Sequence, residues 1–233
     1  MERISKILSA HGVASRREAE RMILAGRVTV GGITAQLGQS AECHEIAIDG
    51  KPLTPQGEFV YIMLNKPRGY VTTMRDERGR KTVRELVAGV GTRVYPAGRL
   101  DINSEGLLIM TNDGRFANAV THPSHNKAKT YRVRVRGDIT GAEESLSRPM
   151  EIDLHMTRPA SVRLLRRTED GGIFLIRIHE GRNRQIRKMC EQCGLAVESL
   201  KRVSIGELKL GTLKSGQWRH LTEAEVEGFV KGL

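Results

Sequence analysis

A short apolar run between two polar segments most constrains the fold of this 233-residue chain. Leu107 to Met110 is long enough for a strand buried on both faces, although periodicity alone does not separate it from a buried helix. Gly98 to Gly106 before it is a polar loop bounded by glycines, and Asn112-Asp113-Gly114 after it has turn composition. A loop fixed by a buried strand can present one reactive side chain, here Asp101, with Arg99 available to a phosphate. Loop aspartates more often form turns or cap helices, so the rest of the chain must decide.

The net charge of +11 and the pI of about 9.9 favour a polyanionic partner, and nucleic acid is the first candidate. A merely basic soluble protein is the alternative. The hydrophobic content of 39% suffices for a core, whereas 4% aromatic residues argue against a wide stacking surface. No apolar run approaches the roughly 20 residues that cross a membrane, and residues 1–6 lack a signal peptide's apolar centre. Three cysteines fit a reducing compartment, so we expect a cytoplasmic protein.

The first fifty residues predict a compact unit of two small helices and a few short strands. Ile4, Ile7 and Leu8 recur at helical spacing, and Ser15 begins a capping-box pattern that opens a second helix. That helix places Arg17 and Arg21 opposite its apolar face. Residues 51–57 form a Pro/Gly-containing connector. The predicted division is therefore a small unit at 1–50, the connector at 51–57 and a larger domain at 58–233.

The larger domain alternates short strands with short helices and predicts an α+β fold around a mainly antiparallel mixed sheet with flanking helices. Its clearest strand is Lys129 to Arg136, where Tyr131 shares one face with two valines and three arginines occupy the other. The predicted elements are strands at 59–64, 161–165 and 173–179, and helices at 82–87, 116–120 and the chain's end.

Arg182 to Gly194 predicts a helix that buries an apolar stripe and turns Arg184 outward. Arg187 falls at the margin of that stripe, from which its guanidinium could reach a cleft or simply extend to solvent. Cys190 and Cys193 both lie on the apolar face, and a structural zinc site needs four ligands, so no metal is expected. The chain lacks a Walker loop, a dinucleotide fingerprint and a zinc-protease motif.

One ionised carboxylate on a basic chain suits a specific kind of chemistry. Asp101, kept charged by a nearby arginine, could attack carbon or remove a proton, and Tyr131 could stack on a base taken out of its helix. Together these groups indicate chemistry at a glycosidic bond within RNA. A second paired carboxylate, which glycosidases normally need, is not apparent in the sequence.

Residues 1 to 50 resemble the alpha-L RNA-binding motif. The resemblance lies in Ser15-Arg16-Arg17-Glu18-Ala19, in Leu24 to Val30 and in the following Gly-Gly turn. It implies binding to structured RNA through backbone and shape. The candidate phosphate contacts are Arg16, Arg17, Arg21 and Arg27.

The stretch Gly98 to Leu108 resembles the catalytic signature of the RsuA family of RNA pseudouridine synthases. Further motifs of that family match in the same order, so the similarity spans nearly the whole chain: Leu64 to Gly69, His122-Pro123-Ser124, Lys129-Thr130-Tyr131 and Glu180 to Arg187. The resemblance implies the pseudouridine synthase fold and isomerisation of a uridine in ribosomal RNA. Large-subunit RNA is favoured over small-subunit RNA.

In this resemblance Asp101 is the essential carboxylate, and Tyr131 stacks on the uracil and is a candidate for proton transfer. Arg187 pairs with Asp101, and Arg99, Lys66 and Arg184 are further RNA contacts. The resemblance implies no metal and no cofactor, and we expect a monomer that acts on ribosomal RNA or a pre-ribosomal particle. The alternative is a non-catalytic RNA-binding factor in ribosome assembly, and the presence of all three catalytic residues argues against it.

Overall fold

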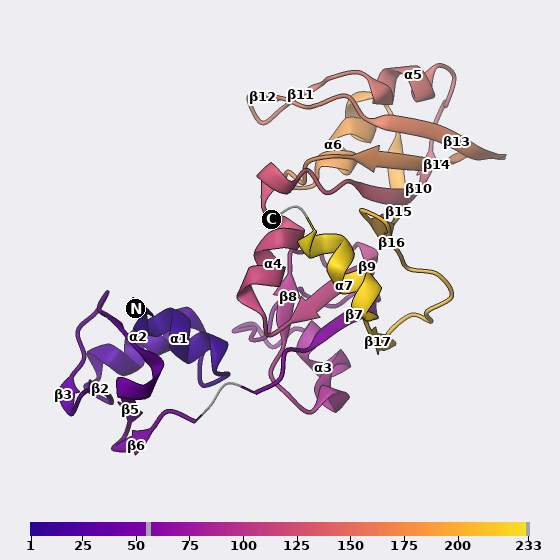
Figure 1. Ribbon diagram of the computed structural model, residues 1–233. Coiled ribbons are helices and arrows are strands. Elements are labelled where there is room, and N and C mark those ends of the chain that lie inside the picture. The colour runs from indigo at the N-terminus through magenta and orange to yellow at the C-terminus, as the bar shows by residue number, and fades with distance from the viewer. Residues whose placement is uncertain (55–56, 232–233) are drawn as a thin grey trace. The chain divides into compact units, whose positions relative to one another are not determined.

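The computed structural model of the chain describes residues 1–54 and 57–231, and it divides into two compact units (Figure 1). The first unit comprises Met1–Val60 with Asn112–Gly114, and the second comprises Tyr61–Thr111 with Arg115–Leu233. Within the described residues no helix is both long enough and apolar enough to span a membrane.

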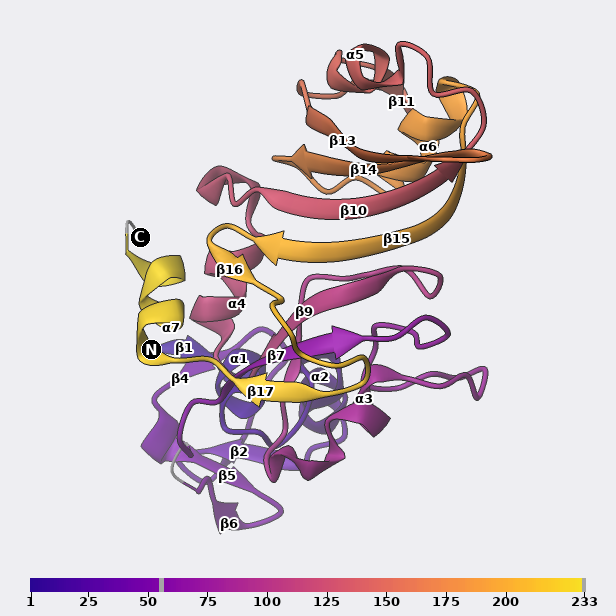
Figure 2. The same ribbon diagram turned by 90° about the vertical axis from the view of Figure 1, so that its right-hand side faces the viewer.

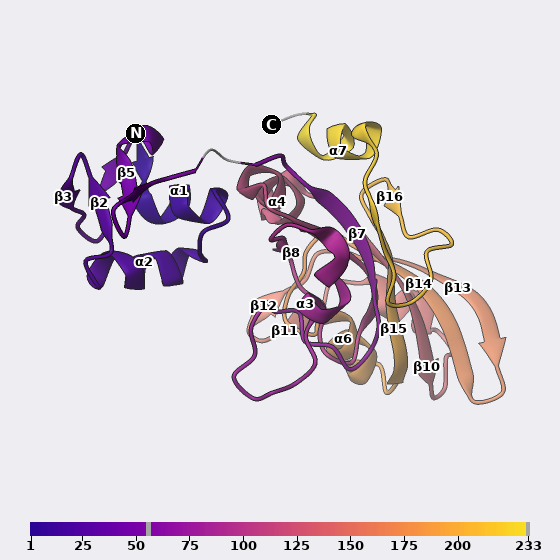
Figure 3. The ribbon, with the colours of Figure 1, turned by 90° about the horizontal axis from the view of Figure 1, so that it is seen from below.

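The first unit packs two helices against short strands, and Figure 3 shows the helices side by side. Ser15 accepts a hydrogen bond from the Glu18 amide and so caps α2, while the core includes Leu8 and Ile23 from the helices and Ile46 from the sheet. The elements are β1 (Glu2–Arg3), α1 (Ile4–Ala10), α2 (Arg16–Leu24), β2 (Val28–Val30), β3 (Ile33–Thr34), β4 (Ser40–Ala41), η1 (Cys43–Glu45), β5 (Ile46–Ile48) and β6 (Lys51–Pro52). The strand order is β3-β2-β5-β6, with β1 paired to β4.

The second unit is built on a nine-stranded sheet whose main path is β13-β14-β10-β15-β9-β7-β17. The pairing of β15 with β9 is parallel, and the other described pairings in this sheet are antiparallel. The predicted α+β class and the mainly antiparallel mixed sheet are therefore confirmed. The strands are β7 (Tyr61–Lys66), β8 (Tyr95–Ala97), β9 (Glu105–Thr111), β10 (Lys129–Arg136), β13 (Ser161–Thr168), β14 (Gly171–Ile178), β15 (Ala196–Ile205), β16 (Leu208–Lys209) and β17 (Trp218–His220), beside a β11 (Glu151–Ile152) and β12 (His155–Met156) hairpin.

Helices pack against different parts of this sheet (Figure 2). At the β13 end α5 packs on β13, and α6 packs on β15 in the middle of the sheet. At the other end α4 and α7 meet through Phe116 and Phe229, whose ring centroids are 5.6 Å apart over a core that includes Met63 and Leu107. The helices are α3 (Val83–Leu86), α4 (Gly114–Thr121), α5 (Ala142–Ser147), α6 (Gln185–Gln192) and α7 (Glu223–Val230), with 3₁₀ turns η2 (Ala88–Val90) and η3 (Pro123–His125).

Several predicted boundaries differ from the structure. The strand predicted at 59–64 begins at Tyr61, because Phe59 is half exposed, and it continues through the buried Asn65 and Lys66. The connector predicted at 51–57 starts with two residues that form β6, and Pro55 and Gln56 lie outside the described residues. The sequence analysis did not anticipate β15, the longest strand of the sheet.

Candidate active site

The loop that carries Asp101 joins β8 to β9 and is held through its own carbonyl groups. All six consecutive carbonyl oxygens from residue 99 to residue 104 accept a hydrogen bond. Thr72 Oγ1 donates to the Leu100 oxygen at 2.6 Å, and the Gly69 amide donates to the Ile102 oxygen at 2.8 Å. A loop with every carbonyl engaged has little freedom, so the half-buried Asp101 side chain leaves from a fixed backbone.

Lys66 supplies two of those hydrogen bonds from beneath the loop. Its side chain is fully buried, and Nζ donates to the carbonyl oxygens of Asp101 at 3.1 Å and Ser104 at 2.8 Å, as well as to that of Pro67. Burial lowers the pKa of Lys66 to about 8, against the opposing effects of the Asp101 and Glu105 carboxylates. The three donors of this ammonium are thus used on backbone, which leaves none for RNA and makes Lys66 a support of the loop.

Arg202, in β15, is the second cation beneath the loop. It is 4% exposed, and it donates from Nε to the Leu107 oxygen at 2.8 Å and from Nη1 to the Arg99 oxygen at 3.4 Å. These bonds span the parallel contact where β15 lies alongside the start of β9. Arg202 was not predicted as a site residue, because β15 was not predicted and the contacts that bury Arg202 come from residues distant in the sequence.

Arg187 approaches the same loop from α6. Its Nη2 donates to the Asn103 oxygen at 3.0 Å and its Nη1 to the Val197 oxygen at 3.3 Å. No ion pair within 4.0 Å joins it to Asp101 among the described residues. Burial lowers the pKa of Arg187 and neighbouring Arg184 lowers it further, while the Asp101 carboxylate raises it, so the two predicted partners act on each other electrostatically.

Asp101 and Tyr131 face one pocket of about 330 Å³, within the range of small-ligand sites. Of the described residues that line it, Asp101 is the only acidic one, and Arg99, Arg182 and Arg184 are its cations. Tyr131 is 8% exposed and forms part of an apolar wall. The lining residues are Arg99, Leu100, Asp101, Ser104, Tyr131, Ile178, Gly181, Arg182, Asn183, Arg184, Gln185, Ile186 and Leu200. The pocket therefore joins one carboxylate to a flat apolar surface within a cationic rim.

Arg184 was expected to face outward from a helix; it is exposed as expected, but it lies before the helix and not within it. The helix begins only at Gln185, whose side chain accepts from the Arg182 amide and donates to Glu180. Arg184 is the N-cap residue with a left-handed φ of 52°, and this conformation places it in the pocket lining.

Cys190 in α6 and Cys193, the C-cap residue of that helix, are both affected by burial. Burial raises the pKa of Cys190 to about 12 and also raises that of Cys193. Across the described part of the chain, no group of three or more His, Cys, Asp or Glu residues could hold a metal ion.

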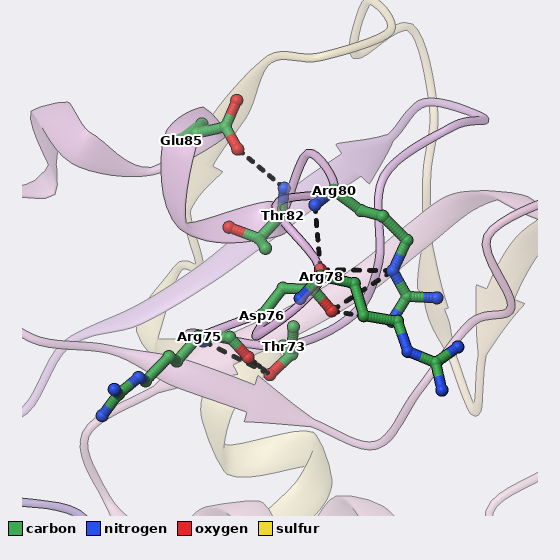
Figure 4. A network of polar contacts seen from close by, with 7 residues as sticks. All are labelled: Thr73, Arg75, Asp76, Arg78, Arg80, Thr82 and Glu85. Carbon is green, nitrogen blue, oxygen red and sulfur yellow. Dashed lines mark hydrogen bonds and ion pairs between the residues drawn. The ribbon is translucent and has the colours of Figure 1, made fainter.

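A basic loop between Val71 and Thr82 borders the loop that carries Asp101 through the Thr72 contact described above. Figure 4 shows its internal network, in which Asp76 accepts from the amides of Arg78 and Arg80 and from the Arg80 guanidinium, with Nη2 to Oδ1 at 2.7 Å. These bonds lower the pKa of Asp76 to about 2. Arg75 and Arg78 extend away from the carboxylate and are exposed.

The arginines predicted to bind RNA in the first unit form two groups. Arg16 and Arg17 are exposed on the first turn of α2. Arg21 pairs with Glu18 at 3.1 Å, and Arg27 makes a two-pronged bond to Asp49 whose shorter contact is 2.6 Å. Arg16 and Arg17 are therefore the freer cations of this unit.

Comparisons with known proteins agree with this geometry. Residues 60–192 match the family of RNA pseudouridylate synthases, and residues 2–39 match the S4 domain. The chain is 40% identical to an RNA pseudouridine synthase of Aquifex aeolicus (strain VF5), over 99% of this chain and 94% of the relative. It is also 40% identical to ribosomal large subunit pseudouridine synthase B of Bacillus subtilis (strain 168), over 97% and 95% of the two chains. A crystal structure of a pseudouridylate synthase aligns with a TM-score of 0.69 at 28% identity, covering 98% of this chain and all of that one.

The fold and the matching family are those of an isomerase that acts on RNA. The chain belongs to the RNA pseudouridine synthase family, in the branch that carries an N-terminal S4 domain. The sequence-based expectation of an RNA-modifying enzyme with a small RNA-binding unit is confirmed.

Proposed function

We propose that this synthase isomerises one uridine of ribosomal RNA, with Asp101 as the essential carboxylate. One observation carries the assignment: Asp101 is the only acidic residue among the described pocket residues, and it stands on a loop whose carbonyls are all engaged. Pre-organisation matters because a reacting group must be held close to its productive position.

The reaction breaks the bond between ribose C1′ and uracil N1, turns the base and forms a bond from C1′ to C5. The proton on C5 is lost and N1 gains one, so no oxidant or reductant is needed. Asp101 acts on the sugar, either as a nucleophile at carbon or as a base toward its 2′ proton. The buried side chains of Lys66 and Arg202 hold the carbonyl groups of the loop from beneath, so the Asp101 carboxylate leaves from a fixed backbone in either route.

Tyr131 is proposed to stack on the uracil once the base has left its helix. Its ring lies in the apolar wall of the pocket with Leu200 and Ile178, a surface suited to the face of a base. Arg187 is proposed to pair with Asp101 when substrate closes the site, while in this structure it holds the Asn103 carbonyl. Arg99 and Arg184 line the rim and are proposed to contact the RNA backbone.

Large-subunit ribosomal RNA is the proposed substrate class. The relative from Bacillus subtilis is named for the large ribosomal subunit and aligns over 97% of this chain. Arg16 and Arg17 are proposed as phosphate contacts of the N-terminal unit, and Arg21 and Arg27 would first have to leave their ion pairs. We further propose a cytoplasmic monomer that acts on free RNA or a pre-ribosomal particle.

Tritium release tests the assignment. Large- and small-subunit transcripts tritiated at uracil C5 are incubated with the enzyme and with Asp101→Asn, naked or in particles. We expect release with large-subunit RNA, and a loss of at least about 10³-fold in Asp101→Asn, since the substitution removes both the charge and the reactive oxygen pair. Asp138→Asn, at an exposed carboxylate outside the pocket, is the matched control and should retain activity.

Each other outcome has a definite meaning. Release from small-subunit RNA alone would overturn the substrate class, and unaltered release by Asp101→Asn would overturn the site. RNA binding without any release would favour a non-catalytic assembly factor.

A further inference from the structure

A second, smaller pocket of about 120 Å³ adjoins the catalytic pocket. The two share Arg99, Tyr131 and Gly181 in their linings, so they lie on two sides of the same wall. The other lining residues come from the end of β8, the end of α4, the start of β10 and β15: Ala97, Gly98, Val120, Thr121, Lys129, Arg202 and Ile205. Three of the described lining residues are cations, and none is a carboxylate.

Arg202 is the deepest of these cations. Its Nε and Nη1 are engaged by the carbonyls of Leu107 and Arg99, but its buried Nη2 has no hydrogen-bond partner among the described residues. A buried charged donor left without a partner is expensive, because it has lost its water and gained nothing in exchange. The side chain is 4% exposed, so solvent does not fill that role at the surface.

Lys129 adds a second cation beside the first. Burial lowers its pKa, and the positive charge of Arg202 lowers it further. Within the part of the chain that the structure describes, its ammonium makes no hydrogen bond or ion pair. The exposed Arg99 guanidinium, likewise without an ion pair there, forms the third corner of the pocket. Like charges held together in a half-buried site without a counter-charge indicate that the balancing anion belongs to a ligand.

We propose that this pocket binds a phosphate of the substrate RNA, next to the nucleotide whose base enters the catalytic pocket. The inference rests on the proposed function, because that nucleotide carries a phosphate on each side of its ribose, and this pocket shares a wall with the base site. Its volume corresponds to about four waters, which is room for the four oxygens of a phosphate. Lys129 serves as the point charge and Arg202 as the hydrogen-bond donor.

The role differs from that of the surface arginines. An exposed cation contacts any passing phosphate, whereas a half-enclosed subsite selects one phosphate and fixes the sugar between it and Asp101. The occupied subsite would relieve the repulsion between Lys129 and Arg202, so binding of the RNA backbone and positioning of the target ribose become one event.

The first test uses inorganic phosphate as the probe on the full chain. Phosphate is titrated against sodium chloride at constant ionic strength while the side-chain ¹⁵N signals of lysines are followed by NMR. We expect a saturable change at Lys129 and a rise of its pKa toward the ordinary value, with no change at Lys209, which is exposed on β16. A linear response, or an equal response at both lysines, would overturn the subsite.

The second test measures RNA binding as a function of salt. For Lys129→Gln we expect about tenfold weaker binding of a large-subunit transcript, as for one lost charge-assisted contact. The slope of log K against log salt should fall in magnitude by about 0.7 to 0.9, the value for one phosphate. Lys129→Arg should restore both quantities, and Lys209→Gln serves as the matched control.

These readouts separate the subsite from the proposed function. Neither the phosphate titration nor the salt slope requires isomerisation, so both measurements test the subsite even if the protein isomerises no transcript. With an active transcript, Lys129→Gln should raise KM more than it lowers kcat. An unchanged salt slope in Lys129→Gln would overturn the assignment of the pocket to RNA phosphate, whatever its affinity for free phosphate.

Discussion

At the scale of single residues, the loop that carries Asp101 depends on a buried lysine beneath it. Lys66 is fully buried and donates to three carbonyl oxygens, two of them in the loop around Asp101. Buried charge alone would destabilise the fold, and its pKa of about 8 reflects that penalty. What the lysine contributes is the satisfaction of backbone acceptors that the surrounding strands leave unpaired.

Lys66→Met keeps the unbranched side chain except for its terminal atom and removes the hydrogen-bond donors. Each abandoned acceptor costs about 1–3 kcal/mol, partly offset by the ammonium no longer being buried, so we expect a net loss of about 2–4 kcal/mol. Urea unfolding measures this loss, and synthase activity should fall by at least about 10²-fold below the denaturation range, because Asp101 loses its fixed position. The exposed Lys214→Met should change stability by less than about 0.5 kcal/mol. Full activity of Lys66→Met would contradict a supporting role.

Single residues also show how far the sequence predicts the site. Asp101 and Tyr131 share a pocket as expected, since each stands on an element that the local pattern identifies. Lys66 was expected to contact RNA and Arg202 was not noticed, because their burial arises from contacts with residues 35 to 103 positions away. No local pattern encodes such a contact. The proposed pairing of Arg187 with Asp101 stays a prediction.

At the scale of elements, the short parallel pairing of β9 with β15 marks the end of the loop that carries Asp101. β9 and β15 pair in parallel at only two positions, and Gly106 lies opposite Arg202. A Cβ added to Gly106 would lie 2.3 Å from the Arg202 carbonyl oxygen, and its φ of 105° is one that other residues avoid. The glycine therefore permits a close approach of two backbones that brings Arg202 under the loop.

Gly106→Ala should force the two strands apart. We expect a loss of about 2–4 kcal/mol from overpacking and backbone strain, together with loss of activity. Chemical denaturation measures the loss of stability, and tritium release measures the loss of activity. Gly216→Ala is a matched control with a φ of 81° and no atom within 4 Å of the added Cβ, and it should show the strain term alone, about 1 kcal/mol. Equal losses of stability in Gly106→Ala and Gly216→Ala would contradict a special close approach of β9 and β15 at Gly106.

The Asp76 loop offers a prediction about pH. The Arg80 side chain is the first cause of the lowered pKa of Asp76, which is about 2. A carboxyl group whose pKa is lowered in the folded protein stabilises the fold at pH values above its ordinary pKa near 4. That stabilisation is lost as the pH falls from about 4 toward 2. In Arg80→Gln, NMR titration of the carboxyl carbon should find the pKa of Asp76 raised toward 3.8. The control Arg84→Gln should leave the pKa of Asp76 unchanged. A similar rise of that pKa in Arg84→Gln would argue against the Arg80 contact as its cause.

Elements with a regular pattern were predicted well, and the others were not. β10 runs from Lys129 to Arg136 as expected, because strict alternation survives over its whole length. β15 carries two register shifts against β10, and its interior includes the buried Arg202, so its apolar residues do not alternate cleanly. The helix predicted from Arg182 begins three residues later, because Gln185 bonds back to the preceding loop.

At the scale of the whole molecule, each of the two units has apolar core residues of its own among the described residues. The core of the first unit includes Leu8, Ile23 and Ile46, and a core of the second includes Met63, Leu107 and Phe116. Each unit is therefore expected to unfold cooperatively on its own, as separate domains do. The single tryptophan, Trp218, lies in β17 of the second unit and reports on that unit alone.

Leu8→Ala tests whether the units unfold separately. Leu8 is fully buried, so its truncation should destabilise the first unit by about 2–5 kcal/mol. We expect far-UV circular dichroism to show an earlier partial transition, while the denaturation midpoint read from Trp218 fluorescence stays unchanged. The matched variant Leu107→Ala, at an equally buried leucine of the second unit, should lower the Trp218 midpoint. A Trp218 midpoint that falls in Leu8→Ala would show that the two cores unfold as one, since a separate second unit has no means of sensing a cavity in the first.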